Sequence, residues 1–288
     1  MIKFILTKYI FVLNTLILSS VLSAQTYEVV YDLKYQPNID EDSLVVEEMS
    51  LLFNVAQQKS IFENLGKQKI KEFYNNLRQS AQLGNSIHYD NSLMPTYNFA
   101  FSVSKDFEKQ KYTFYEPVLG ETYTYDFKEP IHWEVLKSTK EVMGYQCQEA
   151  QLNFGGRTWL AYFSHEIPFS DGPYKFYGLP GLILEIQSTD GDYSFEATSI
   201  YTLNKDIIQP DAIGFKKDKL DQYKERLAEK PSIALKNKLE SNNISVSVKF
   251  DGKDVSGKSF EDTYDKEVKE WMKNHNNPIE KDMIWLDK

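Results

Sequence analysis

The amino-acid sequence predicts an α+β fold, in which helices cover a curved antiparallel β-sheet that can take the form of a half-open barrel. From residue 111 to residue 203, short segments of alternating polar and apolar residues follow one another, separated by turn residues. The chain contains 19 Tyr and 18 Phe, and most of them fall in strand-like segments. Helical patterns dominate after residue 210, so strands precede helices, as in α+β domains.

Ten segments alternate as β-strands do, so that side chains of one parity face a core. The predicted strands are Thr26 to Tyr35, Glu47 to Val55, Tyr112 to Val118, Thr122 to Phe127, Trp133 to Ser138, Tyr145 to Phe154, Thr158 to Ser164, Leu182 to Ser188, Tyr193 to Leu203 and Ser245 to Phe250. Gly155-Gly156 and Asp190-Gly191 are tight-hairpin sequences between neighbouring strands. Successive hairpins predict an antiparallel meander with one buried face and one solvated face.

Apolar residues at helical spacing predict helices in four places. These are Lys67 to Ala81, Lys216 to Ala228, Pro231 through Leu239, and Ser259 to Asn274. Proline suits the first position of a helix, which is why Pro231 is expected to open the third one. We expect residues 25–288 to form a single domain, with 210–288 as a helix-rich C-terminal subregion. A separable helical lid in that region is the alternative.

The N-terminus has the order of a secretory signal peptide. Lys3 and Lys8 form a short basic region, an apolar run from Tyr9 to Leu22 follows, and the small residues Ser23 and Ala24 close it. This order predicts cleavage after Ala24, because the run is shorter than the ~20 apolar residues that span a bilayer. We therefore expect an exported protein in the periplasm, with a secreted or outer-membrane-associated location as the alternative.

Charge and cysteine content narrow the function further. The formal net charge is −9, and it becomes −11 once Lys3 and Lys8 are removed. Such acidity argues against nucleic-acid binding, which needs a basic face. Cys147 is the only cysteine, so no internal disulfide can form. It lies in a predicted strand, which favours a buried small side chain over a nucleophile.

Few residues carry a recognisable catalytic pattern. The four histidines are scattered without metal-ligand spacing, and the common hydrolase, metalloprotease and phosphate-loop motifs are absent. Ser164-His165-Glu166 contains the letters of a hydrolase triad, but neighbours on a strand point to opposite faces. His165 is the best titratable candidate, and its alternative is a histidine that hydrogen-bonds a loop. We expect no cofactor and no metal.

Two clusters could bind a ligand instead. Arg157 and Trp159 share one face of a predicted strand, where a guanidinium and an indole can hold a carboxylate or a ring. The alternative is that Arg157 lies at the rim while Trp159 belongs to the core. The second cluster could line a pocket mouth or lock a loop onto the sheet, and it consists of Tyr174, Lys175, Phe176 and Tyr177.

A glycine-proline string follows this second cluster. It consists of Gly178, Leu179, Pro180, Gly181, Leu182 and Ile183. Pro180 presets φ for a type II turn, and Gly181 is expected to supply the positive φ that the next position requires. Gly178 is expected to take a second unusual backbone shape.

The string and several other segments resemble the GLPGLI family of Bacteroidota. The matching segments are Phe114-Tyr115-Glu116, Gly144-Tyr145-Gln146-Cys147, Gly156 to Phe163, Glu166-Ile167-Pro168, Gly172 to Phe176 and Asn276 to Glu280. Where the family often has Trp-Tyr-Thr, this chain has Tyr162-Phe163-Ser164. The resemblance implies an exported or periplasmic protein of unsettled function, often associated with outer-membrane transport systems. It supplies no catalytic residues.

Three functions remain open at this point. The first is a non-catalytic carrier that holds an apolar or peptide-like ligand in the concavity of the sheet. The second is a hydrolase-like enzyme with a site drawn from Arg157, His165, Glu166 and Asp171. The third is a subunit of an outer-membrane transport-associated or other envelope complex, docking a partner through the Ser259 to Asn274 helix or the Tyr174 to Tyr177 loop.

Overall fold

The computed structural model describes residues 25–82, 97–118, 121–128, 131–203, 206–232, 248–250, 253–255 and 258–283. The predicted signal peptide and most of the predicted helix from Pro231 through Leu239 lie outside these residues. The strands of the main sheet are β1 (Thr26–Tyr35), β2 (Val45–Asn54), β3 (Lys59–Asn64), β4 (Ser102–Asp106), β5 (Lys111–Val118), β6 (Glu121–Phe127), β7 (Glu134–Val142), β8 (Tyr145–Phe154), β9 (Arg157–Ser164), β10 (Leu182–Ser188), β11 (Tyr193–Leu203) and β12 (Ile213–Gly214).

The sheet consists of two meanders that meet at its centre. Its strand order is β12-β6-β5-β4-β3-β2-β1-β11-β10-β9-β8-β7, so β1 to β6 form an N-terminal meander and β7 to β11 a C-terminal one. The long antiparallel pair of β1 and β11 joins the two. The other neighbours are antiparallel as well, except that the short β12 runs parallel to β6. The predicted class, an α+β fold with a large antiparallel sheet, is confirmed.

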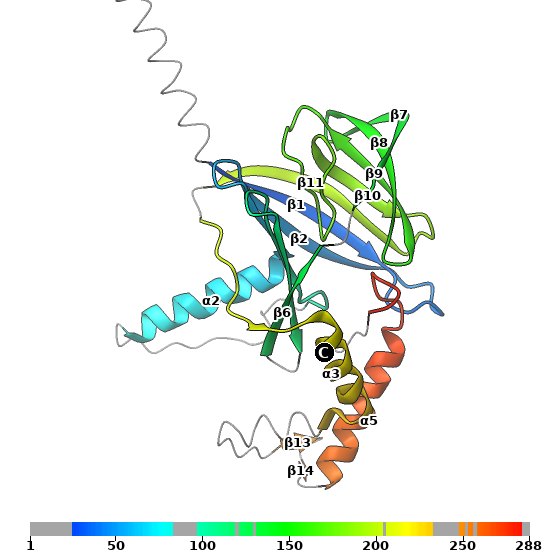
Figure 1. Ribbon diagram of the computed structural model, residues 1–288. Helices are drawn as coiled ribbons and strands as arrows, with labels where there is room; N and C mark the ends of the chain where they lie inside the picture. Colours follow the sequence, from blue (N-terminus) through cyan, green and yellow to red (C-terminus); the bar gives the residue numbers. More distant parts are fainter. Residues whose placement is uncertain are drawn as a thin grey trace, which may run out of the picture.

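The connection between the meanders requires the sheet to curl. Ten strand spacings separate β6 from β7 in the strand order, which is about 48 Å in a flat sheet. Only residues 128–133 connect them along the chain, and so few residues span about 25 Å at most. The two ends of the sheet must therefore approach one another. In Figure 1 the green strands β7 to β9 accordingly stand at an angle to the blue strands β1 and β2.

Two-residue loops form two hairpins of the C-terminal meander, β7–β8 and β8–β9. Gly155 and Gly156 have φ of +59° and +76°, and Met143 and Gly144 have φ of +53° and +82°. Positive φ at both central positions is the type I′ geometry, whose twist matches that of the flanking strands. Both loops therefore set the register on either side of β8, and the predicted hairpin at Gly155-Gly156 is confirmed.

Three strands of the main sheet were not predicted: the two-residue β12, and β3 and β4, whose inward-facing residues are partly polar. On β3, Ser60 and Asn64 face inward on either side of Phe62, and on β4 the inner face carries Lys105. A strand whose core face is polar lacks the alternation that identifies strands in a sequence. The segment β14 (Lys253–Val255) was also missed, and it pairs with β13 (Val248–Phe250).

Helices lie on both faces of the sheet. The helix α2 (Leu65–Gln82) packs on the outer face of β2 and β3. The helix α3 (Lys217–Glu229) lies against β6, where Lys224 Nζ is 2.5 Å from a Glu116 carboxylate oxygen on the inner face. The helix α5 (Lys258–Asn274) leads into residues 275–283, which we call the C-terminal arm. The red arm in Figure 1 returns toward the end of β1.

Candidate functional site

The inner face of the curved sheet is filled by the chain itself. Residues 165–181, between β9 and β10, cross this face, and we call them the inner strap. Tyr174, Lys175 and Phe176 are completely buried in it. The Phe176 ring lies 4.8 Å from that of Trp159, which is also completely buried. The described part of the strap therefore occupies the concavity in which the sequence analysis placed a ligand.

A buried ion pair fixes the middle of the strap. Lys105 on β4 contacts Asp171, and neither side chain is exposed to solvent. The same ammonium group donates to the carbonyl oxygens of Gly172 at 2.8 Å and Phe176 at 3.2 Å. Burial lowers the pKa of Lys105 and raises that of Asp171, and each charge opposes the shift of the other. Asp171, one of the catalytic candidates, is thus engaged in holding the strap.

A second buried centre joins the strap to the C-terminal arm. Lys175 Nζ lies 2.5 Å from a Glu280 carboxylate oxygen and donates to Tyr125 Oη at 3.3 Å. The Tyr174 hydroxyl donates to the same carboxylate. Burial and the nearby Glu280 charge raise the pKa of Tyr174 well above its usual range. The ammonium group also lies 4.6 Å from the centre of the Phe114 ring, a cation–π contact.

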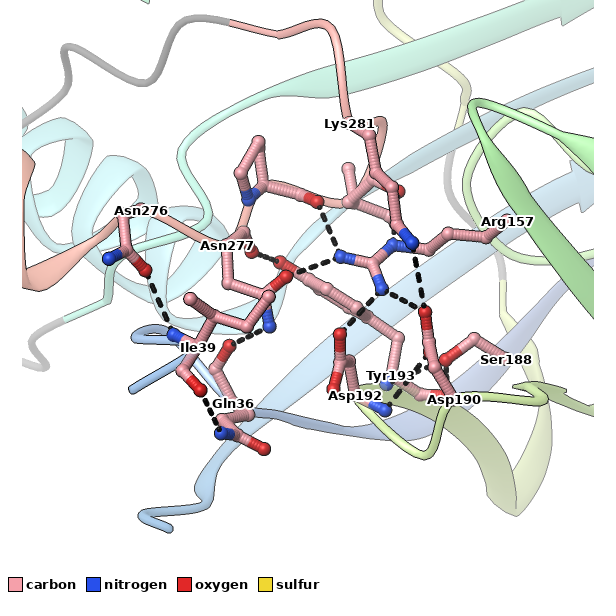
Figure 2. A network of polar contacts seen from close by, with 12 residues as sticks. Gln36, Ile39, Arg157, Ser188, Asp190, Asp192, Tyr193, Asn276, Asn277 and Lys281 are labelled. Atoms are coloured by element: carbon pink, nitrogen blue, oxygen red, sulfur yellow. Dashed lines mark hydrogen bonds and ion pairs between the residues drawn. The ribbon is translucent and has the colours of Figure 1, made fainter. Parts of the chain in front are cut away.

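Arg157 is the centre of a third network, drawn in Figure 2. A guanidinium has five N–H donors, and here each one has a partner. The acceptors are Ile279 O for Nε at 3.1 Å, Asp190 and Asp192 for Nη1 at 2.5 and 2.6 Å, and Asn277 Oδ1 and Pro278 O for Nη2 at 2.5 and 3.0 Å. The side chain is 0% exposed. An incoming carboxylate would have to displace one of these partners.

The arm that Arg157 holds also bonds to the N-terminal meander. Asn277 donates through its backbone N–H to Pro37 O at 3.1 Å and through Nδ2 to Gln36 O at 2.9 Å. The Tyr193 hydroxyl donates to the Asn277 carbonyl, beneath the guanidinium in Figure 2. Residues of both meanders therefore meet on the arm, just after the end of β1 and at the first residues of β9 and β11.

The other candidate residues lie apart from one another. His165 is exposed at the far end of β9 from Arg157, roughly 25 Å away along the strand, and its Nε2 is 3.3 Å from Gln148 Oε1. Tyr177 is half-buried, with its ring 4.4 Å from that of Tyr112. The hydrolase-like site needs at least two of Arg157, His165, Glu166 and Asp171 to converge. Arg157 lies at the opposite end of β9 from His165 and Glu166. The Glu166 carboxylate accepts from the Gln146 N–H at 3.2 Å, and Asp171 is held by Lys105. A ligand role for the seven predicted binding residues stays a prediction.

The predicted type II turn is wrong at Gly181. Gly178 has the expected positive φ, +96°, but Gly181 does not have positive φ. The Gly181 N–H instead bonds to Leu179 O at 2.8 Å, a three-residue turn centred on Pro180. A Cβ atom at Gly181 would lie 2.1 Å from Ser164 O. Glycine is thus required by the close approach of two backbone segments.

Two further features concern reactivity. Cys147 is buried in β8, as predicted, and burial raises the pKa of its thiol to about 11. Among the residues that the structure describes, no three His, Cys, Asp or Glu side chains gather closely enough to hold a metal ion.

Within the same part of the chain, no helix combines the length and the apolar character needed to cross a membrane.

An open groove lies on the opposite, outer face of the sheet, between α2 and the chain that leaves β11. Its volume is about 540 Å³, within the range of small-ligand sites. We call it the α2 groove. Its uncharged lining consists of Leu52, Ile61, Leu65, Gln68, Asn75 and Ile208, and its charged lining consists of Glu28, Glu63, Glu72, Asp206, Lys69 and Lys71. Leu52 and Ile61 are buried and form an apolar floor.

Gln68 adds one polar group to this groove. Its Nε2 atom is buried and has no hydrogen-bond partner among the residues described. An unpaired buried donor costs about 1–3 kcal/mol, so an acceptor placed there by a ligand would be favourable. Gln68 was not among the residues predicted from the sequence to bind a ligand. The available signal was the continuous apolar run Leu51-Leu52-Phe53, which indicates a strand covered on both faces.

Comparison with known proteins gives a short family match and distant structural similarities. Residues 154–185 match a family described as a protein of unknown function, Porph_ging. This stretch contains β9, the inner strap and the start of β10. No curated protein matches the chain significantly.

Solved structures resemble the chain at low sequence identity. The structure of PNGF-II is 14% identical, with a TM-score of 0.48, covering 68% of this chain and 32% of PNGF-II. The chain thus spans about a third of that protein. An uncharacterized conserved protein from Thermus thermophilus is 8% identical, with a TM-score of 0.34, covering 68% of this chain and 92% of that protein. The LolA superfamily protein NE2245 from Nitrosomonas europaea is 11% identical, with a TM-score of 0.25 and the same coverages.

Proposed function

We propose that this chain is an exported, non-catalytic binding protein for an apolar or peptide-like ligand, and that the ligand occupies the α2 groove. The observation that carries the proposal is the buried, unpaired amide donor of Gln68 beside the apolar floor of Leu52 and Ile61. Ligand sites combine apolar walls with a few polar groups that orient the ligand. A peptide carbonyl or a similar acceptor would pair with Gln68 while apolar groups cover the floor.

The inner face offers less support for a ligand site. The charged and aromatic candidates there are engaged with one another, as the five partners of Arg157 and the contacts of Lys105 and Lys175 illustrate. The enzyme alternative also has less support, because Arg157 and His165 lie at opposite ends of β9. Export to the periplasm is part of the proposal and rests on the N-terminal signal pattern.

A single observation favours the third function, a subunit of an envelope complex. Three large apolar side chains that are close in the sequence are exposed, with 59% of Ile39 and 66% of Leu44 accessible between β1 and β2 and 57% of Val46 accessible on β2. Exposed apolar patches mark contact surfaces. A triple serine variant should then migrate faster than wild type on native gels of envelope extracts. Equal migration would remove this candidate.

Two measurements test the binding proposal. The protein is first purified from the envelope of its native host, and its native and denatured masses are compared. A stoichiometric adduct that leaves on denaturation is expected, and a bare mass counts against a carrier. The second measurement is a fluorescence titration with N-phenyl-1-naphthylamine, a neutral apolar probe.

A pair of neighbouring asparagines supplies matched variants for the titration. Asn75 and Asn76 are both exposed on α2, but Asn75 lines the groove. N75W should fill part of the groove and lower the affinity for the probe about fivefold or more, since it adds bulk where the ligand lies. N76W should bind as wild type does. Equal affinities of the two variants would contradict the proposed site.

A further inference from the structure

A second groove continues the α2 groove on the outer face. Its volume is about 500 Å³, and we call it the lysine groove because Lys59, Lys109 and Lys111 line it, together with Asp106. Ile208 lines both grooves. Lys59 and Ile61 are two residues apart on β3 and face the same side, so about 7 Å of strand separates the cation from the apolar floor.

The ammonium groups in this groove are only loosely paired. Lys59 Nζ and Lys109 Nζ lie 3.7 and 4.0 Å from an Asp106 carboxylate oxygen. Lys111 Nζ lies 3.7 Å from Asp126. These separations exceed hydrogen-bond distance, so the ammonium groups keep donors available for an anion.

The charge of the groove is opposite to that of the whole chain. Three lysines and one carboxylate line it, whereas the formal net charge of the protein is −9. A concave, locally positive surface concentrates field lines and attracts anions. At its border, the Ile208 side chain is 67% exposed beside these cations. An apolar surface therefore adjoins available cationic donors.

We propose that the lysine groove takes the anionic group of the ligand, so that the ligand is an anionic amphiphile. Its apolar chain would lie on Leu52 and Ile61, and its carboxylate, phosphate or sulfate would contact the three lysines. This inference rests on the proposed function, because the apolar part occupies the α2 groove. Salt should weaken binding, since Lys109 and Lys111 are exposed to solvent and Lys59 is half-exposed.

Two matched probes test the charge requirement. Decanoate and decanol share one alkyl chain and differ in their polar end. Each is titrated against wild-type protein carrying N-phenyl-1-naphthylamine, and decanoate binding is also measured by calorimetry. Decanoate should displace the dye at a lower concentration than decanol does. Equal potency of the two would overturn the inference.

Three variants locate the effect. The K59Q/K109Q/K111Q protein should bind decanoate about five- to tenfold more weakly and decanol as before, given modest contributions from each exposed cation. The control K219Q/K266Q/K269Q removes three exposed lysines from α3 and α5 and should leave both unchanged. D106N should bind decanoate more tightly than the wild-type protein does. An equal loss for both probes, or an equal loss in the control, would overturn the inference.

The outcomes also separate the two proposals. A dye that fails to bind, or that binds N75W as well as wild type, contradicts the α2 groove as the ligand site. Lysine-dependent decanoate binding in calorimetry would then remain as evidence for the anion site alone. If N75W weakens dye binding but decanoate displaces the dye no better than decanol does, the proposed function is supported and the anionic ligand is rejected.

Discussion

The two faces of the sheet use charged residues in opposite ways. On the inner face, Arg157 has a partner for each of its five donors, and Lys105 and Lys175 each contact a carboxylate and further acceptors. On the outer face, Lys59 and Lys109 lie 3.7 and 4.0 Å from an Asp106 carboxylate oxygen, with Lys59 half-buried and Lys109 exposed.

This difference separates structural charges from available ones. Desolvation penalises an unpaired buried charge by on the order of several kcal/mol, and the three buried cations of the inner face are each paired with a carboxylate. One oxygen of Asp171, Oδ2, has no hydrogen-bond partner among the residues described. A solvent-accessible lysine loses little free energy when its ion pair is loose, so it can exchange one partner for another. Residue type alone does not distinguish the two cases. The completeness of the hydrogen bonding does.

The largest effect is expected at Gly181, where the strap meets β9. G181V places a Cβ atom 2.1 Å from Ser164 O, and backbone on both sides leaves little room to adjust. We expect a loss of about 3 kcal/mol or more in the free energy of unfolding, measured by urea denaturation. G214V is the control, since nothing lies within 4 Å of its Cβ position. Similar stabilities of the two variants would contradict the close approach.

The next effect is expected from breaking the buried pair of Lys175 and Glu280. E280Q leaves a buried ammonium group without its carboxylate, so we expect a loss of about 3 kcal/mol. The K175M/E280Q double variant should regain part of that loss, because it removes the uncompensated charge as well. The K175M single variant is measured as well. If the double variant is less stable than E280Q by the full free energy that K175M alone loses, the two groups are independent.

R157K tests whether completeness of bonding matters more than charge. Lysine keeps the positive charge but has three donors in place of the planar five, so at least two bonds to the arm or the aspartates are lost. We expect a loss of about 2–3 kcal/mol. R226K, on the exposed face of α3, should change stability by about 0.5 kcal/mol or less. Equal effects would place the role of Arg157 in its charge.

The pKa of the Asp190 carboxyl determines how the stability of the Arg157 network should respond to acid. Burial alone would raise its pKa, but the Ser188 hydroxyl and the Arg157 guanidinium lower it below its usual range. A depressed pKa stabilises the folded state above the unfolded pKa of about 4, and this contribution is lost as the pH falls through the folded pKa. D190N should therefore be less stable than wild type at pH 7, and the gap should narrow below pH 4. A gap that widens in acid would contradict the assignment.

The smallest effect on folding is expected at the border of the two grooves. Ile208 is 67% exposed, so I208S should change the free energy of unfolding by about 0.5 kcal/mol or less. It removes an apolar wall from both grooves, and the affinity for N-phenyl-1-naphthylamine should fall about twofold to threefold. A variant that loses stability but not affinity would place Ile208 in the fold and outside the ligand site.

Much of the fold was predictable because its signals are local. The bounds of β1, β8, β10 and β11 agree with the alternating segments, and paired glycines mark the β8–β9 turn. The site was predictable only in part. Arg157 and Lys175 were singled out as candidate ligand-binding residues, and that role stays a prediction. Two of the partners that they have in the folded chain, Asn277 and Glu280, lie more than 100 residues away in the sequence.

The sequence by itself determined the α+β class, the hairpins and most of the helices, because φ preferences and hydrophobic periodicity act over a few residues. Only the tertiary structure decided which charges are structural and which are available. Lys105 and Lys59 are alike as residues in a sequence, yet one is sealed against Asp171 and the other is held loosely on the surface. Chain folding decides this, since it alone sets the distance between each charge, its partner and water.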